Sequence, residues 1–409
     1  MRLLIALLLA LPLGADTTIT LLHFSDYHSH ALPFYTDEGE LGGIARAVGY
    51  LREQKRNGAL VFSGGDMINK GAPAWSDYYH CAEWPWLNGI VSAMAFGNHE
   101  LDYGRPSFES CRKKLDYPIL SANTPGFKPY AVFKTKGVRV GVFAVAGPDF
   151  ARLVKGETFE DSVTAARAAV AKLKGEADVI VMIGHESTED DYALAKAVPG
   201  IDLIFGSHSH LKRQLVRIEG TKTAYVSPWQ YLTYISRVEL TVGEDRRMKS
   251  VRGGLIPVDA SMPVDLATAK RVTRMQSDLE KAHPDLFSPI GRLASALSTD
   301  QLAERTLAVM REVAKADVAV STKSSFRGAL PAGTLTLESL RGALPYDNEL
   351  VVCTMTSAQL QSIDDAYVTP FEPGKTYRVA TTDYLASVEY KFTCDKTGLR
   401  VREELRKRL

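Results

Sequence analysis

Apolar runs that end in glycine, aspartate and histidine constrain this 409-residue chain more than any other feature of its sequence. Each run has the length and composition of a buried strand, and helical stretches lie between some of them. Strands that alternate with helices predict a layered α/β domain in the first half of the chain. The predicted strands are Thr17–Phe24, Ala59–Phe62, Val91–Phe96, Val138–Val145, Asp178–Ile183 and Ile201–Phe205.

Two of the intervening stretches carry helix signals. Ile44, Val48 and Leu51 recur at helical spacing and mark one apolar stripe. A second helix is predicted over Asp161–Lys174, with its first residue as the N-cap and Gly175 at its expected stop.

The pattern changes near residues 256–264, where prolines and small polar residues predict a linker. A helix is expected next, with Val272, Met275, Leu279 and Ala282 on one face, and it should end at His283. A smaller α+β unit is predicted beyond it. Its expected strands are Val318–Ser321, Leu350–Met355 and Tyr377–Thr381. The predicted boundaries are 1–15 for a leader, 16–257 for the first domain, 258–285 for the linker and helix, and 286–409 for the second domain.

The leader has the features of a cleaved signal peptide. Arg2 precedes the apolar run Leu3–Leu13, and small residues up to Ala15 suit cleavage. The run is shorter than the roughly 20 apolar residues that span a bilayer. A buried N-terminal strand is the alternative. The signal peptide predicts a secreted or periplasmic protein, with no membrane span in the mature chain.

Charge excludes two classes of partner. The chain has 49 basic and 48 acidic residues, so loss of Arg2 with the leader would leave it neutral. A neutral chain offers no positive field for a nucleic acid polymer or an anionic membrane.

Export would permit disulfides between the four cysteines, which allow 3 pairings. Pairing within each half of the chain, Cys81 with Cys111 and Cys353 with Cys394, is the expected arrangement. There is no C-x-x-C spacing of the kind found in zinc fingers and redox dithiols.

The motifs after the strands have the composition of a metal site. Imidazole and carboxylate are ligands that Zn, Mn and Fe share, and a carboxylate can bridge two cations. Side chains two apart, as in D-x-H and H-x-H, lie on the same face of an extended segment. A single histidine at a strand end is more often only a polar residue. The motifs are Asp26-Tyr27-His28, Gly64-Gly65-Asp66, Gly97-Asn98-His99-Glu100, Gly184-His185 and Gly206-Ser207-His208-Ser209-His210.

In this order the five motifs resemble the calcineurin-like metallophosphoesterase superfamily, with one serine inserted after Gly206. The resemblance implies a β-sandwich flanked by helices (αββα) and two divalent metal ions, Zn, Mn or Fe. A pair of ions about 3.5–4 Å apart holds a phosphoryl group and lowers the pKa of a bound water, which then attacks phosphorus. The resemblance assigns Asp26, His28, Asp66 and His210 to one metal and Asp66, Asn98, His185 and His208 to the other, with Asp66 as the bridge.

Two further residues have an expected catalytic role. By the same resemblance, His99 stabilises the transferring phosphoryl group or protonates the leaving group, and Asp102 orients its imidazole. The alternative for Asp102 is a turn cap. The remaining histidines, His23, His30, His80 and His283, are expected to be structural or to lie on the surface.

The segment Gly97–Gly104 resembles the G-N-H-E-F-D-Y-G of the exported 5′-nucleotidase family, whose members act on 5′-nucleotides, UDP-sugars or 2′,3′-cyclic nucleotides. In that family a smaller C-terminal domain binds the nucleotide. Arg327 would meet anionic oxygens of the substrate, while Tyr346 and Tyr384 would stack on the base. Asn348 would bond the edge of the base, and Arg292 occupies the place of a further substrate arginine. Ordinary packing of the tyrosines and a surface ion pair of Arg327 are the alternatives.

The C-terminal domain departs from the family pattern. Lys323-Ser324-Ser325 replaces a triple glycine, and Val388-Glu389-Tyr390 replaces a second glycine-rich segment. Lysine and serine there would reshape the pocket. The sequence therefore predicts an exported, monomeric phosphoesterase that releases phosphate from nucleoside 5′-monophosphates, with the substrate between the domains. The alternatives are nucleotide sugars, 2′,3′-cyclic nucleotides or a non-nucleotide anion as substrate, and a secreted binding protein without turnover.

Overall fold

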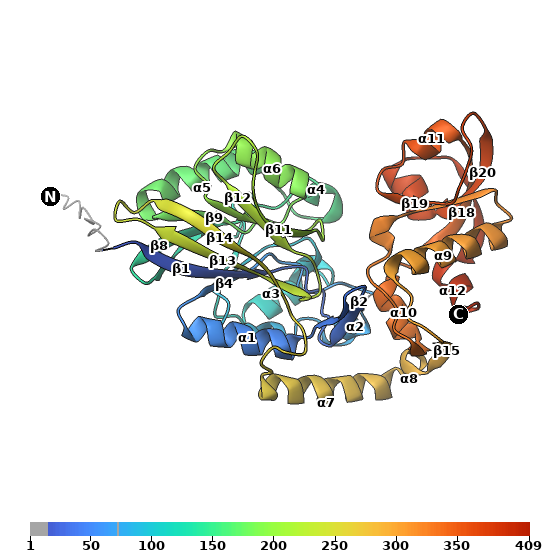
Figure 1. Ribbon diagram of the computed structural model, residues 1–409, viewed down its shortest axis with the longest axis horizontal. Coiled ribbons are helices and arrows are strands. Elements are labelled where there is room, and N and C mark those ends of the chain that lie inside the picture. Colours follow the sequence, from blue (N-terminus) through green and yellow to red (C-terminus); the bar gives the residue numbers. More distant parts are fainter. Residues whose placement is uncertain (1–14, 72) are drawn as a thin grey trace. The chain divides into compact units, whose positions relative to one another are not determined.

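Two six-stranded sheets face each other in the N-terminal part of the computed structural model, which describes residues 15–71 and 73–409 (Figure 1). The predicted signal peptide, apart from Ala15, lies outside the described residues. The first sheet has the order β14-β13-β1-β4-β5-β6 and the second β11-β12-β10-β9-β8-β7. The first contains β1 (Thr17–Phe24), β4 (Leu60–Ser63), β5 (Ala93–Ala95), β6 (Ile119–Leu120), β13 (Tyr234–Val242) and β14 (Met248–Pro257). The second contains β7 (Tyr130–Thr135), β8 (Val138–Phe143), β9 (Val179–Met182), β10 (Leu203–Phe205), β11 (Lys212–Arg217) and β12 (Ala224–Pro228).

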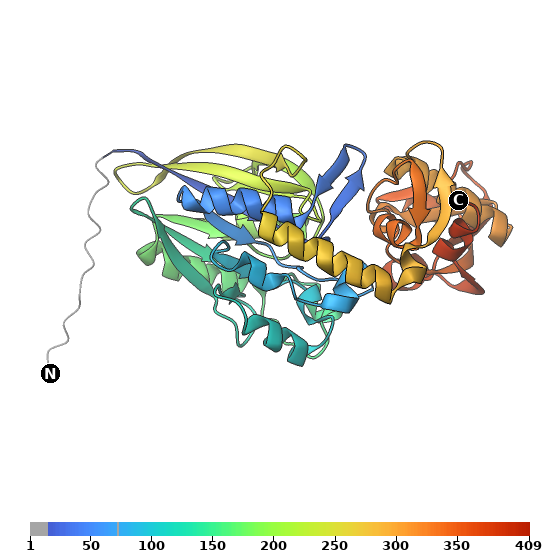
Figure 2. The same cartoon turned by 90° about the horizontal axis from the view of Figure 1, so that it is seen from below.

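Apolar side chains from both sheets form one core between them, which includes Leu21, Phe62, Val140 and Val181. Helices α5 and α6 cover the outer face of the second sheet, and α1 packs against β4 of the first (Figures 1 and 2). The layers are therefore α-β-β-α, which confirms the predicted fold class. The helices of this part are α1 (Ile44–Arg56), α3 (Arg105–Arg112), α4 (Phe150–Leu153), α5 (Ser162–Glu176) and α6 (Thr188–Ala197), with 3-10 turns η1 (Trp84–Leu87) and η2 (His99–Leu101).

Parallel pairing brings the carboxyl ends of the central strands to one edge. β1, β4, β5 and β6 are parallel in the first sheet, and β8, β9, β10 and β12 are parallel in the second. The loops that leave these ends carry all five motifs, where α/β proteins build their sites.

Some local predictions need correction. Asp161 is the N-cap of α5, because its side chain accepts a hydrogen bond from Thr164 N at 2.8 Å. The stop predicted at Gly175 was wrong, since the helix continues to Glu176 and ends in an extended residue, Ala177, that needs no left-handed glycine. Several strands escaped prediction; β14 did so because none of its residues is buried and it lacks a continuous apolar run.

The chain divides into two compact units. Unit 1 contains the described residues up to Leu32, together with Gly42–Lys70 and Tyr79–Ala269; unit 2 contains Pro33–Leu41, Gly71–Tyr78 and Lys270–Leu409. No helix among residues 15–71 and 73–409 combines the length and the apolar character that crossing a bilayer requires.

Unit 2 is built on a five-stranded sheet of order β19-β16-β20-β18-β21. Helix α9 packs on this sheet, and its Leu307 and Met310 share a core with Val352 and Ala380. The strands are β15 (Pro289–Leu293), β16 (Val318–Thr322), β17 (Gly333–Thr336), β18 (Glu349–Thr356), β19 (Ala366–Val368), β20 (Thr376–Thr382) and β21 (Cys394–Arg400). Its helices are α8 (Pro284–Phe287), α9 (Thr299–Ala314), α10 (Leu337–Ala343), α11 (Ser357–Gln361) and α12 (Val401–Arg406), with turns η3 (Lys323–Ser325) and η4 (Leu385–Glu389). Helix α7 (Leu266–Ala282) runs from unit 1 into unit 2, and β2 (Pro33–Thr36), β3 (Gly39–Gly42) and α2 (Ala74–Tyr79) lie almost wholly in unit 2 sequence ranges.

The expected cysteine pairing is confirmed, with one disulfide in each unit. Cys81 pairs with Cys111 across a Cα–Cα distance of 5.9 Å, and Cys353 pairs with Cys394 across 4.3 Å. The second bond joins residues that are already partners in the β18–β21 ladder.

We expect the Cys81→Ser/Cys111→Ser double variant to lose about 3–4 kcal/mol of free energy of unfolding, because the bond closes a 30-residue loop. Urea titration followed by circular dichroism measures this change. The matched Cys353→Ser/Cys394→Ser variant shows whether the effect is confined to unit 1. An unchanged unfolding free energy in the first variant would contradict the prediction.

Candidate metal and catalytic site

Seven side chains predicted to bind metal meet at the common edge of the two sheets in unit 1. Five of them adopt a left-handed backbone, with φ between 48° and 61°. Such a backbone is costly for residues other than glycine and concentrates at functional sites. The five are Asp26 and His28 after β1, Asp66 after β4, and His208 and His210 after β10; Asn98 follows β5 and His185 follows β9.

The ligand atoms form three overlapping groups, in each of which all atoms lie within 4.8 Å of one another. The first group is Asp26, His28 and His210, and the second is Asp66, His185 and His208. Together the two groups contain every aspartate and histidine of the two predicted ligand sets. Asp66, which was predicted to belong to both sets, is a member of only the second of these two groups. His28 Nε2 lies 3.9 Å from Asp66 Oδ2, which joins the two groups. The third group combines His28, Asp66 and His99.

Backbone carbonyls orient two of the imidazoles. His185 Nδ1 lies 2.6 Å from Gly64 O, and His28 Nδ1 lies 3.1 Å from Ile68 O. A ring nitrogen that donates to a carbonyl leaves the other nitrogen free to bind a cation. His185 Nε2 accordingly faces the carboxylate of Asp66 at 3.1 Å.

Asp149 orients a third imidazole in the opposite sense. Its Oδ2 lies 3.0 Å from His208 Nε2, so Nδ1 is the nitrogen left for a cation. Burial raises the pKa of Asp149, but the hydrogen bond and the charge of His208, with smaller contributions from a backbone N–H and Arg152, together outweigh burial and lower that pKa. Sequence reasoning missed this residue, although it follows β8, the one predicted strand to which no motif was assigned.

The carboxylates stay ionised in a buried place. Asp26 and Asp66 are almost fully buried. Burial favours their neutral forms, but the imidazoles of His210 and His185 hold the pKa of Asp26 and Asp66 below the usual range. Burial also lowers the pKa of His185, but the charge and hydrogen bond of Asp66, the charge of Asp26 and the Gly64 carbonyl together outweigh burial and raise that pKa to about 9.

The residues fit divalent cations. Asn98 Oδ1 is buried and accepts no hydrogen bond from the described residues, so it is an oxygen without a partner at the edge of this cluster. Carboxylate, imidazole and amide donors without thiolate are the set that suits Zn, Mn or Fe. The three groups of ligand atoms supply the carboxylate and imidazole donors of this set.

Glu100 ties two of the ligand loops together, a role that sequence reasoning did not assign. Its carboxylate accepts hydrogen bonds from the backbone N–H groups of Met67 at 2.7 Å, Gly97 at 2.6 Å and Asp66 at 3.1 Å. Burial, with the charge of Asp66, raises the pKa of Glu100 to about 7. The position inside the G-N-H-E motif was the available signal.

His99 and Asp102 form the predicted pair. His99 Nδ1 lies 2.7 Å from Asp102 Oδ2, and both side chains remain partly exposed. Asp102 also accepts a hydrogen bond from Lys70 N at 2.8 Å, so it contacts the loop after β4 as well as the imidazole. His99 N donates to Asp66 Oδ1 at 2.9 Å, which ties the pair to the metal cluster.

The predicted substrate residues gather at one end of the sheet in unit 2. Tyr346 and Asn348 precede β18 and Tyr384 follows β20, two strands paired antiparallel with Leu350 opposite Thr382. Tyr346 and Tyr384 are 41% and 40% exposed. Arg327 Nη2 lies 3.4 Å from Tyr346 Oη. Arg292 is exposed on β15, in a separate two-stranded sheet, and the described contacts do not bring it to this group.

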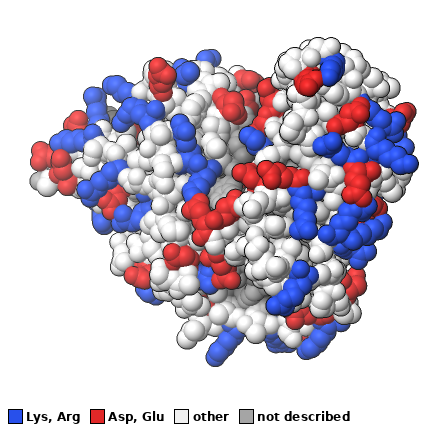
Figure 3. All heavy atoms as spheres, turned by 45° about the vertical axis from the view of Figure 1, so that its right-hand side comes forward, with Lys and Arg blue, Asp and Glu red and all other residues white. Residues whose placement is uncertain are grey.

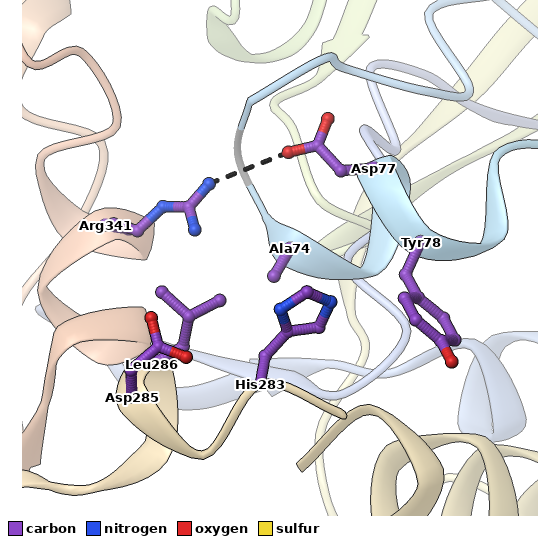
Figure 4. Close-up of a pocket in the computed structure, with 7 residues that line it drawn as sticks. All are labelled: Ala74, Asp77, Tyr78, His283, Asp285, Leu286 and Arg341. Carbon is purple, nitrogen blue, oxygen red and sulfur yellow. Dashed lines mark ion pairs between the residues drawn. The ribbon is translucent and has the colours of Figure 1, made fainter. Parts of the chain in front are cut away.

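Two surface features lie outside these clusters. A cavity of about 320 Å³ in unit 2 contains none of the predicted site residues (Figure 4). Arg341 and Asp77, which line it, form an ion pair at 3.8 Å. Acidic and basic side chains are mixed over the face drawn in Figure 3, in keeping with the balanced charge of the sequence.

Sequence comparisons divide the chain in the same way. Residues 19–212 match the calcineurin-like phosphoesterase family, and residues 290–363 match the 5′-nucleotidase C-terminal domain. The protein UshA of Yersinia enterocolitica is 27% identical, over 90% of this chain and 85% of its own length. The 5′-nucleotidase of Vibrio cholerae is 26% identical, over 82% of this chain and 73% of its own.

Solved structures share the fold. The 5′-nucleotidase precursor of Thermus thermophilus has a TM-score of 0.74 at 20% identity, with 96% of both chains covered. The sulfate thiohydrolase SoxB of the same organism also has a TM-score of 0.74, at 19% identity over 95% of this chain and 94% of its own. The chain therefore carries a calcineurin-like phosphoesterase domain over residues 19–212 and the C-terminal domain of 5′-nucleotidases over residues 290–363, and it is a phosphoric ester hydrolase.

Proposed function

We propose that this protein is an exported, dinuclear metal phosphoesterase that hydrolyses nucleoside 5′-monophosphates to nucleoside and phosphate. The observation that carries the proposal is the pair of ligand groups joined through Asp66, with the His99–Asp102 pair hydrogen-bonded to the same carboxylate. Export rests on the predicted signal peptide, and cleavage is expected near Ala15.

Seven side chains would hold two metals. In this proposal Asp26, His28 and His210 bind one ion, and His185, His208 and Asn98 bind the other, with Asp66 shared. Divalent cations bound there would supply positive charge for the phosphoryl group and lower the pKa of a water molecule. Glu100 and Asp149 would fix the loops and the tautomer of His208, so that the ligands need little rearrangement on binding.

His99 would act on the leaving group. Asp102 binds Nδ1, so Nε2 is the nitrogen from which His99 gives a proton to the departing ribose oxygen. The Asp102 carboxylate also stabilises the imidazolium form that donates this proton. The hydrogen bond from His99 N to Asp66 keeps the imidazole beside the phosphate site.

Unit 2 would recognise the nucleoside. Exposed aromatic rings bind a base by stacking, and Tyr346 and Tyr384 occupy neighbouring places at one end of the sheet. Arg327, beside Tyr346, would meet anionic oxygens, and Asn348 would bond the edge of the base. Arg292 is the least supported member of the set, because it lies on another sheet.

Two kinds of alternative remain: other substrates for the same phosphoesterase chemistry, and a binding protein without turnover. Lys323, Ser324 and Ser325, where related proteins have glycines, favour a differently shaped pocket for nucleotide sugars, 2′,3′-cyclic nucleotides or a non-nucleotide anion. A binding protein without turnover would not need the complete ligand and His99–Asp102 set found here.

We expect the mature protein to release phosphate from AMP when Mn or Zn is added, and EDTA to abolish the release. Phosphate is measured by a colorimetric assay, with UDP-glucose, 2′,3′-cyclic AMP and p-nitrophenyl phosphate as parallel substrates. Cleavage of another substrate without AMP cleavage would contradict the substrate assignment and leave the metal chemistry. Metal loading without cleavage of any substrate would contradict the assignment of hydrolase activity.

We expect His99→Ala to lower kcat for AMP by about 10²- to 10⁴-fold, because a positioned acid contributes that much to proton transfer. Metal content, measured by mass spectrometry, should stay at the wild-type value. His283→Ala, a histidine outside the cluster, is the matched control. An unchanged kcat in His99→Ala would remove the proposed role.

We expect Asp66→Ala to reduce bound metal from two ions per chain to fewer than one, because this carboxylate is proposed to contact both. The measurement is metal analysis after dialysis against a trace of Mn or Zn. Asp161→Ala, which removes only the exposed N-cap of α5, should leave two ions bound. Full metal content in Asp66→Ala would contradict the dinuclear site.

A further inference from the structure

We propose that the segment Arg400–Arg402 is a positioning element that holds the Tyr346 ring for the nucleobase. The inference rests on the proposed function, because it deepens the role given there to Tyr346. Neither arginine belongs to a motif that the sequence singled out, and both lie more than 50 positions along the chain from the ring that they would serve.

Hydrogen bonds fix the main chain on both sides of Tyr346. Arg402 Nη1 donates to Leu344 O at 3.1 Å and to Pro345 O at 2.7 Å, the two carbonyls that precede the ring. Arg400 Nη1 donates to Asp347 O at 2.8 Å, just after it. Two guanidinium groups thus bond the carbonyls of three neighbours of Tyr346, namely Leu344, Pro345 and Asp347.

The backbone and a second charge complete the arrangement. Val401 N donates to Asn348 O at 3.1 Å, so the Arg400–Arg402 segment bonds the loop at its far end as well. Arg402 Nη2 lies 3.8 Å from Asp347 Oδ2. The β18–β21 ladder, which places Glu349 opposite Arg400, delivers this segment to the loop.

The Arg402 side chain is mostly buried, whereas the Tyr346 ring that it supports is exposed. The Arg402 side chain is only 12% exposed, whereas the Tyr346 ring is 41% exposed. Pro345 restricts its own φ, and the carbonyls on either side are bonded, so the main chain at Tyr346 has little freedom. A ring presented from a fixed backbone loses less entropy when it binds, which is the benefit of preorganisation.

The hydrogen bonds from position 402 to the loop around Tyr346 require an arginine. A guanidinium group offers several N–H donors in a fixed plane, so one side chain can serve two carbonyls and one carboxylate. A lysine ammonium at position 402 would keep the charge and lose this fixed geometry. A side chain at position 402 that lacks both the charge and the guanidinium geometry should leave Pro345 O, Leu344 O and the Asp347 carboxylate without their Arg402 partner.

The test compares Arg402→Met with Arg406→Met in the full-length mature enzyme loaded with Mn. Arg406 lies on the same helix, and its ion pair with Glu403 at 2.9 Å is partly exposed, which makes it a matched control. The substrates are AMP and ribose 5-phosphate, which carries the same 5′-phosphate and ribose without a base. Both KM and kcat are measured for AMP, and kcat/KM for ribose 5-phosphate.

We expect Arg402→Met to raise the KM for AMP about tenfold and to change kcat less than about twofold. The value of kcat/KM for ribose 5-phosphate should change less than about twofold, and Arg406→Met should match wild type for both substrates. Equal losses for both substrates would mean a general structural role and would overturn the inference, as would an unchanged KM for AMP.

A second variant decides the matter if Arg402→Met does not fold. Arg402→Lys retains the charge, so we expect it to fold with a KM for AMP raised by about threefold. A wild-type KM in this variant would overturn the need for the guanidinium fork. Absence of AMP hydrolysis by the unaltered enzyme would overturn the proposed function, and this inference with it.

Discussion

Two carboxylates buried side by side are the constraint on which the rest of unit 1 depends. Asp26 and Asp66 are shielded from water, and charges in such a place are costly unless cations or strong donors face them. The imidazoles of His185 and His210 partly meet this need. The donor set and the orphan oxygen of Asn98 fit divalent cations for the remainder. Strain in the left-handed loop backbone is tolerated because the two sheets hold the loops on both sides.

A second layer of contacts makes that arrangement rigid. Glu100 bonds the backbone of two ligand loops, and Asp149 fixes one ring nitrogen of His208. Backbone carbonyls do the same for His28 and His185. The contacts of Asp149 and of the two carbonyls decide which ring nitrogen of each histidine faces the cluster, and those of Glu100 fix the backbone of the loops. The proposed catalytic pair, His99 and Asp102, is held beside this cluster because His99 N donates a hydrogen bond to Asp66.

In unit 2, too, contacts from other residues hold the predicted site residues in place, but these residues are exposed aromatic rings instead of buried carboxylates and imidazoles. The rings of Tyr346 and Tyr384 are exposed, and the elements that hold them are buried beneath. Asp383 receives hydrogen bonds from the backbone of Glu349 and Tyr384, so β18 and the second ring share one anchor. Lys323, directly after β16, forms an ion pair with Asp365 at 3.3 Å.

The sequence by itself predicted the order of the buried strands β1, β4, β5, β8, β9 and β10, the cysteine pairing as the simplest choice, and the residue types of the candidate metal site. It could do so because strand ends and D-x-H or H-x-H spacing are local properties of the chain. Glu100, Asp149 and Arg402 act on partners far away in the sequence, or on backbone atoms that no motif encodes. Only the tertiary structure decided their roles, because parallel pairing and the β18–β21 ladder bring those partners within hydrogen-bond distance.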